Sequence, residues 1–425
     1  MRTEFISDRP RISRVICLAV ITAWTILLHQ APVCATRPAY YPRPDDQGGW
    51  RVARGSGAIR KLGGMDRSKL ETAFQFTKRC TRNGGLLVVR HGYLVFEGYF
   101  GRAQRNVNPD MASTGKAYTS AACGIMLSEF KSKIPQGLDQ KVFTPQYLPE
   151  AFPVDDPRKA DITLGELLCM SAGFHGEGTS PGVVMGKVVP LTPVPGQDIR
   201  NLDQSSLRTP LWIAPGAGYS YSSPSPHIAS MVLRRVTGME LQDYIEARLA
   251  KPMGWGSWAY CLHRGNFVMP HANGAGSIAV HATDALRFCY CLLRHGLWQS
   301  KQLIPASYVA LLNRPSKYNP HSPFSLMFEN NSDGHVPGAP RDAYWKSGAG
   351  GFAIYIVPSL DLVIYKMGGD NDQYDPSLTG LPQPVADTSR DSWKPFPRTP
   401  FDDGSMGGDD GVRRVLELVC CAAIG

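Results

Sequence analysis

The stretch that decides the fold and the chemistry of this chain is Ser113-Thr114-Gly115-Lys116, which opens an apolar, small-residue run from Ala117 to Leu127. The run predicts a buried helix, with the Ser113 hydroxyl and the Lys116 amine on one helix face, one turn apart. A lysine held neutral can take the serine proton, and a helix N-terminus favours an oxyanion. The stretch therefore predicts a serine nucleophile with a lysine base. A helix cap followed by a surface lysine is the plainer alternative.

A second stretch, 215–223, could complete such a site. It is a Pro-Gly turn followed by Tyr219-Ser220-Tyr221-Ser222-Ser223, directly before a predicted long helix. Tyr221 could share a proton with Lys116, because a nearby ammonium would favour the phenolate. Tyr219 competes for this role, and an ordinary core or surface tyrosine is the alternative.

A third stretch is Tyr344-Trp345-Lys346-Ser347-Gly348-Ala349-Gly350-Gly351, which directly precedes a predicted pair of strands. Glycines at a strand edge allow a substrate to approach the backbone closely. Lys346 adds positive charge for a carboxylate or for a developing oxyanion. An ordinary glycine-rich turn between strands is the alternative.

These three elements, in this order, resemble the serine β-lactamase and penicillin-binding-protein superfamily, whose motifs include S-x-x-K and K-T-G. The closer likeness is to its class C β-lactamase-like branch, whose central element is Y-x-N. That branch includes family VIII esterases, D-aminopeptidases and 6-aminohexanoate-dimer hydrolases. The likeness spans roughly residues 65–370, and supporting stretches are 87–100, 162–173, 350–352 and 358–362.

The resemblance implies an α+β fold of the β-lactamase/transpeptidase type. Its antiparallel sheet is built from both termini with flanking helices, and the active site lies between the sheet and a mostly helical inserted domain. It also implies roles for individual residues. Ser113 is the nucleophile, Lys116 and Tyr221 are general base and acid, and the backbone N–H groups of Ser113 and Ala349 form the oxyanion hole. The residues implied to bind substrate are Ser223, Lys346, Ser347 and Gly348.

Two departures from the pattern favour an ester substrate. Ser223 stands where the family usually has Asn, and Lys346-Ser347-Gly348 lies one residue closer to the following glycine pair than the K-T-G pattern places it. We therefore expect an exported serine hydrolase that forms an acyl-enzyme with carboxylic esters or small amides. The alternatives are a β-lactamase, a D-Ala-D-Ala carboxypeptidase or D-aminopeptidase, and a non-catalytic peptide or cell-wall binding module of the same fold.

Two competing motifs are set aside. Residues 178–182 fit G-x-S-x-G, but a nucleophile elbow needs a strand before it and a helix after it, and a loop rich in glycine and proline is expected here. A second S-x-x-K, Ser128 with Lys131, lies late in the same predicted helix as Lys116 and is typical of a solvated surface.

The chain has 425 residues, of which 43% are hydrophobic and 19% charged, so it can bury a large core. Residues 1–35 carry four arginines, an apolar stretch from 15 to 28 and Val33-Cys34-Ala35, which together predict a signal peptide. The mature protein is expected to be periplasmic or secreted, with membrane attachment only if this segment stays uncleaved. The expected division is a flexible lead-in at 36–64, a sheet domain at 65–112 and 331–425, and a mostly helical domain at 113–330.

Partners other than a small ester or amide are not expected. The net charge is +9 without a dense basic block, which argues against nucleic-acid binding, and no H-E-x-x-H or similar spacing suggests a metal site or a cofactor. The sequence leaves the oligomeric state and the disulfide pairing open. Five cysteines in apolar helix-like runs are expected as buried free thiols: Cys123, Cys289, Cys291, Cys420 and Cys421.

The periodicity of the chain predicts its main elements. The expected helices are 66–81, 117–127, 162–170, 225–250 with a break at 237–238, 283–295 and 412–423. The expected strands are 86–89, 93–96, 351–357 and 362–366. Residues 175–210 are expected to form a loop, and 369–410 an exposed excursion.

Overall fold

The computed structural model describes residues 40–178, 180–394 and 411–424, which belong to one compact unit. The predicted signal segment and residues 36–39 lie outside the described residues. Within the described part of the chain, no helix combines the length and the apolar character needed to cross a membrane.

A seven-stranded antiparallel sheet carries the fold, in the order β12-β13-β14-β15-β16-β1-β2. The two N-terminal strands therefore join the C-terminal ones, because β1 pairs with β16. The strand bounds are β1 Gly84–Arg90, β2 Tyr93–Phe100, β12 Phe324–Ser325, β13 Phe328–Asn330, β14 Tyr344–Gly348, β15 Phe352–Val357 and β16 Leu362–Met367. The antiparallel sheet built from both ends of the chain, and with it the α+β class, is confirmed.

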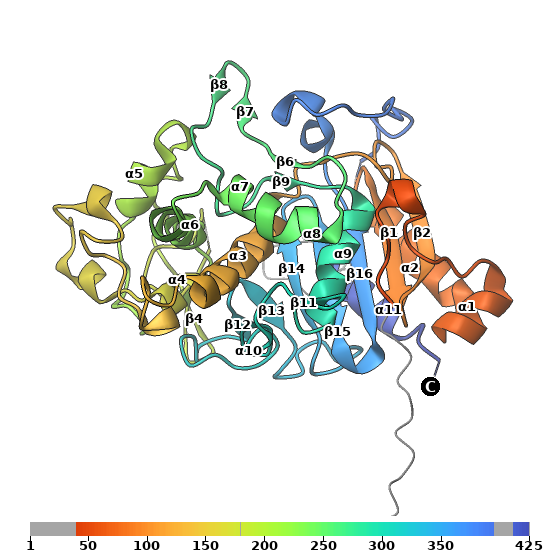
Figure 1. The fold of residues 1–425 in the computed structure, drawn as a ribbon, viewed down its shortest axis with the longest axis horizontal. Coiled ribbons are helices and arrows are strands. Elements are labelled where there is room, and N and C mark those ends of the chain that lie inside the picture. The colour runs from red at the N-terminus through yellow and green to blue at the C-terminus, as the bar shows by residue number, and fades with distance from the viewer. Residues whose placement is uncertain (1–39, 179, 395–410, 425) are drawn as a thin grey trace, which may run out of the picture. The chain divides into compact units, whose positions relative to one another are not determined.

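Helices bury both faces of this sheet, which explains its continuous apolar strands. Successive side chains of a strand point to opposite faces. Leu86 and Val88 of β1 accordingly pack in the cluster that contains α2 (Arg67–Cys80) and α11 (Val412–Cys420). Leu87 and Val89 pack in the cluster that contains α3 (Lys116–Glu129) and α9 (Ala282–Leu293). Figure 1 shows α9 lying across the sheet beside β16, with α3 next to it.

The remaining elements are shorter, except for the 14-residue α6, and most of them lie between β2 and β12. The helices are α1 Gly55–Gly63, α4 Leu164–Leu168, α5 Leu202–Leu207, α6 Pro224–Thr237, α7 Leu241–Ile245, α8 Lys251–Met253 and α10 Ala306–Val309. The small strands are β3 Gly182–Val184, β4 Lys187–Val189, β5 Tyr219–Ser220, β6 Ala259–Tyr260, β7 His263–Arg264, β8 Phe267–Val268, β9 Ile278–Ala279, β10 Leu297–Trp298 and β11 Lys301–Gln302.

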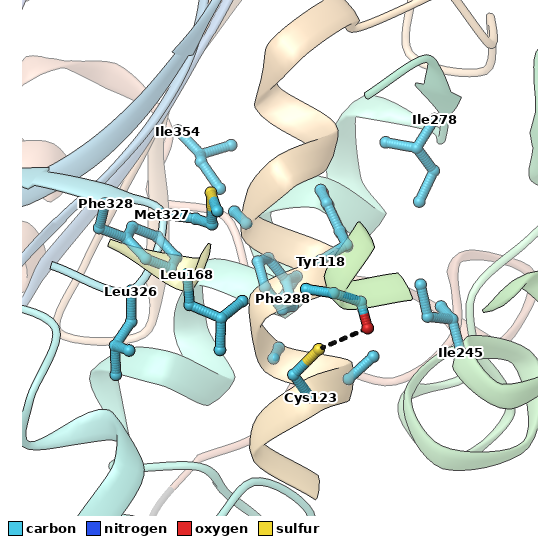
Figure 2. Close-up of a cluster of buried hydrophobic side chains, with 14 of the residues drawn as sticks. Tyr118, Cys123, Leu168, Ile245, Ile278, Phe288, Leu326, Met327, Phe328 and Ile354 are labelled. Atoms are coloured by element: carbon cyan, nitrogen blue, oxygen red, sulfur yellow. Dashed lines mark hydrogen bonds between the residues drawn. The ribbon is translucent and has the colours of Figure 1, made fainter. Parts of the chain in front are cut away.

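Helix α3 runs through the core and fixes the position of the S-x-x-K motif. Its residues from Lys116 to Met126 are all buried. Figure 2 shows its Tyr118 against Phe288 of α9, with side chains of several other elements around the helix. The two rings stack with centroids 4.1 Å apart. A helix enclosed on all sides cannot turn or slide without opening the core, so its first turn is held rigidly.

Local sequence signals place several elements correctly. Asp66 caps α2, because its carboxylate accepts from the backbone N–H groups of Ser68 and Lys69. Thr163 and Glu166 form a capping box at the start of α4. The long helix expected at 225–250 does break at Gly238, whose φ of 73° is left-handed.

The lead-in expected to be flexible is ordered from residue 40 onward. Trp50 is 3% exposed, and its ring packs edge-on against Tyr290 of α9 with centroids 5.4 Å apart. Asp45 forms a 2.6 Å ion pair with the buried Arg287. Helix α1 also lies in this segment. The high content of proline, arginine and glycine predicted flexibility, whereas the order of this segment depends on aromatic and ionic contacts with α9.

Three further expectations need correction. The sheet includes β12 and β13, so its C-terminal segment begins before the expected boundary at 331. The expected loop at 175–210 contains the β3–β4 hairpin and α5. In the expected excursion at 369–410, Tyr374 is 8% exposed and stacks on Phe352, whereas residues 395–410 lie outside the described residues.

The cysteines follow the expectation with one exception. Cys123, Cys289, Cys291 and Cys420 are buried free thiols. Cys421, which directly follows the end of α11 at Cys420, is exposed.

Candidate active site

Ser113 lies in a tight turn directly before α3, rather than in the helix itself. A 3-10 turn covers Ala112–Gly115, and α3 begins at Lys116. The backbone enters this turn through Ala112, whose φ of 46° is unusual for a residue with a side chain. The backbone N–H of Ala112 donates to Asp110, and its carbonyl accepts from the N–H of Ser277. Contacts from two directions therefore hold the turn that presents the serine.

The end of β14 packs directly against this turn. A Cβ atom on Gly348 would lie 2.3 Å from the carbonyl oxygen of Met111 and 2.9 Å from the backbone nitrogen of Thr114. Only glycine permits such an approach. The glycine-rich stretch was expected to allow a close approach of substrate. In the structure, Gly348 of this stretch allows the close approach of the turn that contains Ser113.

Ser113, Lys116 and Ser223 form a short chain of polar contacts. Lys116 Nζ lies 2.8 Å from Ser113 Oγ and 2.9 Å from Ser223 Oγ. The lysine side chain is completely buried, and Ser223 is 8% exposed. The structure therefore brings the predicted nucleophile and base into hydrogen-bond distance, and adds Ser223 as a second partner of the amine.

Tyr221 completes this cluster. The centroid of its ring lies 5.0 Å from Lys116 Nζ and 5.0 Å from Lys346 Nζ. Burial raises the pKa of Tyr221 above its ordinary value, and the opposing effects of the Lys116 charge and of a hydrogen bond with Ser113 are smaller. The Lys116 charge does favour the phenolate, as expected, but desolvation outweighs it and the pKa is raised in the net. At neutral pH this side chain is a phenol.

The competing tyrosine has a different environment. Tyr219 is 3% exposed, and its ring packs against Phe324 at 5.4 Å. Burial raises its pKa well above the ordinary value. Of the two tyrosines, Tyr221 is the one that contacts both lysines.

A cavity of about 460 Å³ opens above Ser113. Five of the predicted site residues line it: Ser113, Tyr221, Ser347, Gly348 and Ala349. Lys116, Ser223 and Lys346 are buried and are not among its lining residues. Ser223 and Lys346 were expected to bind substrate, and the structure instead gives them partners within the protein.

The comparisons with known proteins identify the family of this chain. A family model described as Beta-lactamase matches residues 71–372, which is more than half of the chain. The chain belongs to the beta-lactamase family. Members of this family are serine hydrolases, so the chain is an enzyme of that type.

Solved structures similar to this beta-lactamase-family chain show the same fold at low sequence identity. A protein from Bacteroides dorei DSM 17855 that is assigned as a beta-lactamase has a TM-score of 0.57 and 16% sequence identity. The match covers 74% of this chain and 97% of that protein. A protein from Bacillus anthracis assigned as a 6-aminohexanoate-dimer hydrolase has a TM-score of 0.57 and 18% sequence identity. The match covers 77% of this chain and 84% of that protein. EstCE1, a hydrolase with promiscuous acyltransferase activity, has a TM-score of 0.55 and 15% sequence identity. The match covers 82% of this chain and 98% of EstCE1. Among curated proteins, none matches this chain.

Two residues of this family member escaped the sequence analysis. Glu329 of β13 lines the cavity and contacts the Lys346–Ser347 pair. Its signal was a single acidic residue after the apolar run 326–328. Gln373 donates from Nε2 to the carbonyl oxygens of Asp110, at 2.8 Å, and Ala349, at 3.2 Å. Gln373 thus connects the segment that precedes Ser113 to the turn that contains Ala349. No local sequence pattern indicates this role of Gln373.

The motifs that were set aside lie in unsuitable places for a nucleophile. Ser180 lines the cavity, but β3 follows it where an elbow would require a helix. Ser128 and Lys131 are both exposed near the end of α3. Within the described ranges, no cluster of three or more His, Cys, Asp or Glu side chains could hold a metal ion.

Proposed function

We propose that this protein is an exported serine hydrolase that cleaves carboxylic esters through an acyl-enzyme on Ser113. The observation that carries the proposal is the 2.8 Å contact between Lys116 Nζ and Ser113 Oγ beside an open cavity. Small amides are the second substrate class. The arginine-rich and apolar segment 1–35 supports export to the periplasm or the medium.

The proposed reaction uses one proton donor or acceptor at each step. Lys116, in its neutral form, takes the Ser113 proton while the serine oxygen attacks the substrate carbonyl. The oxyanion accepts hydrogen bonds from the backbone N–H groups of Ser113 and Ala349. Tyr221, as a phenol, gives its proton to the departing alkoxide and regains one from Lys116. Water then attacks the acyl-enzyme by the reverse transfers and releases the acid.

The hydroxyl of Ser223 has a proposed role different from the one the family resemblance implies. It is 2.9 Å from Lys116 Nζ, so it orients the amine toward Ser113 instead of gripping the substrate. A serine hydroxyl is also too short to replace the amide that would hold an acylamino side chain. This favours simple esters over β-lactams and peptides. Ser347 and Gly348 remain as the proposed substrate-contacting residues of β14.

Intact-protein mass spectrometry tests the proposal against its alternatives. The purified protein is exposed in parallel to para-nitrophenyl butyrate and to a penicillin, and is then quenched. A butyryl adduct on the peptide that contains Ser113, without a penicilloyl adduct, is the expected result. A stable penicilloyl adduct would favour a penicillin-binding or β-lactamase activity. The absence of any adduct and of any ester turnover would favour a non-catalytic binding module.

The phenol form of Tyr221 makes a prediction about pH. The general acid must be protonated, and its pKa is raised above the ordinary value of about 10, so its proton is kept as the pH rises to that value. We expect kcat to show no loss assignable to this group between neutral pH and about pH 10. Tyr221→Phe should lower kcat by about 10²-fold or more.

The matched control is Tyr219→Phe, which changes another tyrosine of the same cavity and should leave kcat near the wild-type value. Absorbance titration of the wild type against Tyr221→Phe reports the tyrosine ionisation directly. A phenolate that forms below pH 9, or a Tyr221→Phe variant with normal kcat, would contradict the assignment.

A further inference from the structure

The outer edge of β14 faces the cavity next to Ser113. Strand β13 pairs with β14 only at Tyr344 and Trp345, so among the described strands none covers this side of Lys346–Gly348. Ser347, Gly348 and Ala349 line the cavity. An acyl group on Ser113 therefore lies beside this edge, where an ammonium and a hydroxyl would ordinarily attract an anionic substrate group.

Both of these groups are already engaged by one side chain of the protein. Glu329 Oε1 accepts a hydrogen bond from Ser347 Oγ at 2.8 Å and lies 3.5 Å from Lys346 Nζ. Its other oxygen accepts from the indole N–H of Trp345 at 2.9 Å. The carboxylate thus turns around the uncovered strand edge, where it accepts a hydrogen bond from the hydroxyl and forms an ion pair with the ammonium.

This carboxylate is charged and belongs to the cavity surface. Burial raises the pKa of Glu329, but the Lys346 charge and the Ser347 hydrogen bond outweigh it, and the pKa is lowered. Lys346 is completely buried, whereas the Glu329 side chain keeps 21% of its surface exposed and lines the cavity. A substrate approaching this edge therefore meets the carboxylate, with the lysine behind it. The exposed Glu177 adds a second carboxylate to the cavity lining.

We propose that Glu329 makes the site selective for uncharged esters, because it occupies the position that would otherwise receive a substrate carboxylate. This inference rests on the proposed function and names its substrate class. A carboxylate placed beside Ser347 would face Glu329 within a few ångströms, and Lys346 is already paired with Glu329. Like charges at such a distance reduce kcat/KM by roughly 10- to 100-fold.

The opposing charge in the same cavity is Arg413. It lines the wall with Glu329, and its charge contributes to the lowered pKa of that carboxyl. An anionic substrate bound at Arg413 would bypass Glu329, and it would then be hydrolysed as fast as its neutral counterpart or faster. The two possibilities give opposite orders of reactivity in the wild-type protein.

The experiment compares charged and neutral esters of nearly the same shape. On the acyl side, para-nitrophenyl monosuccinate is paired with its methyl ester. On the leaving-group side, the butyryl ester of para-hydroxybenzoate is paired with the corresponding methyl benzoate. In the wild type we expect kcat/KM for the anionic member of at least one pair to be about 10-fold or more below the neutral member.

The variant Glu329→Gln keeps the shape of the side chain and removes its charge. We expect it to raise the anionic-to-neutral ratio of the disfavoured pair by about 10-fold. Glu71→Gln on α2, an exposed glutamate that is not among the residues lining the cavity, is the matched control and should leave the ratio unchanged. If Glu329→Gln does not fold, the anionic-to-neutral ratio of kcat/KM in the wild type, measured at low and high salt, still tests whether the site rejects anionic esters.

Equal rates within both pairs, a wild-type preference for the anionic esters, or a ratio that Glu329→Gln leaves unchanged would overturn the inference. These results all include ester hydrolysis that depends on Ser113. If no ester of either kind is hydrolysed in a Ser113-dependent way, the proposed function fails together with the inference, so the two failures are distinguishable.

Discussion

Ser113→Ala is expected to reduce kcat/KM for para-nitrophenyl butyrate by about 10⁴- to 10⁶-fold, because the variant has no oxygen to form the acyl-enzyme. The substitution removes one partner of the buried Lys116 amine and leaves the other, Ser223, in place. The expected cost in the free energy of unfolding is therefore only about 1 kcal/mol. Kinetics with the ester, labelling by a fluorophosphonate probe and thermal unfolding together measure both effects.

The chain provides its own control for this experiment. Ser128→Ala alters the serine of the second S-x-x-K, which is exposed near the end of the same helix. It should retain full turnover and full labelling. A Ser113→Ala protein that is still labelled, or that still hydrolyses the ester at a comparable rate, would show that another nucleophile acts. Ser180, which also lines the cavity, would then be examined next.

Lys116→Ala is expected to slow acylation by about 10²- to 10⁴-fold, the usual effect of removing a general base. The lysine is completely buried, so alanine also leaves a cavity in the first turn of α3. Lys116→Met removes the amine and keeps most of the volume, and it should lose as much activity with a smaller loss of stability. Rates of fluorophosphonate labelling measure acylation separately from the release of the product.

Chemical rescue distinguishes a missing base from a distorted site. A small primary amine added to Lys116→Ala should restore part of the labelling rate, whereas it should have no effect on Ser113→Ala. Lys131→Ala, the exposed lysine of the second motif, is the matched control and should behave as the wild type. Native-like folding of Lys116→Ala with near-normal turnover would remove Lys116 from the proposed mechanism.

The site has a local part and a long-range part. The spacing of Ser113 and Lys116 predicts their contact, because three residues across a helical turn bring two side chains together whatever surrounds them. Capping at Asp66 and Thr163 and the hairpin of β1 and β2 depend on similarly short distances along the chain. These features were predictable because each is decided by neighbours within a few residues.

Interactions between distant segments were not predictable in this way. Glu329 reaches Ser347 across the β13–β14 pairing, and Gln373, which follows β16, bridges Asp110 and Ala349. The order of the lead-in depends on Trp50 meeting Tyr290, which is 240 positions further along the chain. No local periodicity encodes such contacts, because they form only when folding brings separate segments of the chain together.

The amino-acid sequence by itself therefore determined the contact between Ser113 and Lys116 at the start of α3, the apolar strands and the family to which the chain belongs. Only the tertiary structure decided that the pKa of Tyr221 is raised and not lowered, and that Glu329 contacts Lys346 and Ser347. The physical reason is that proton affinity and ion pairing depend on burial and on charges from other segments, which short-range patterns do not specify.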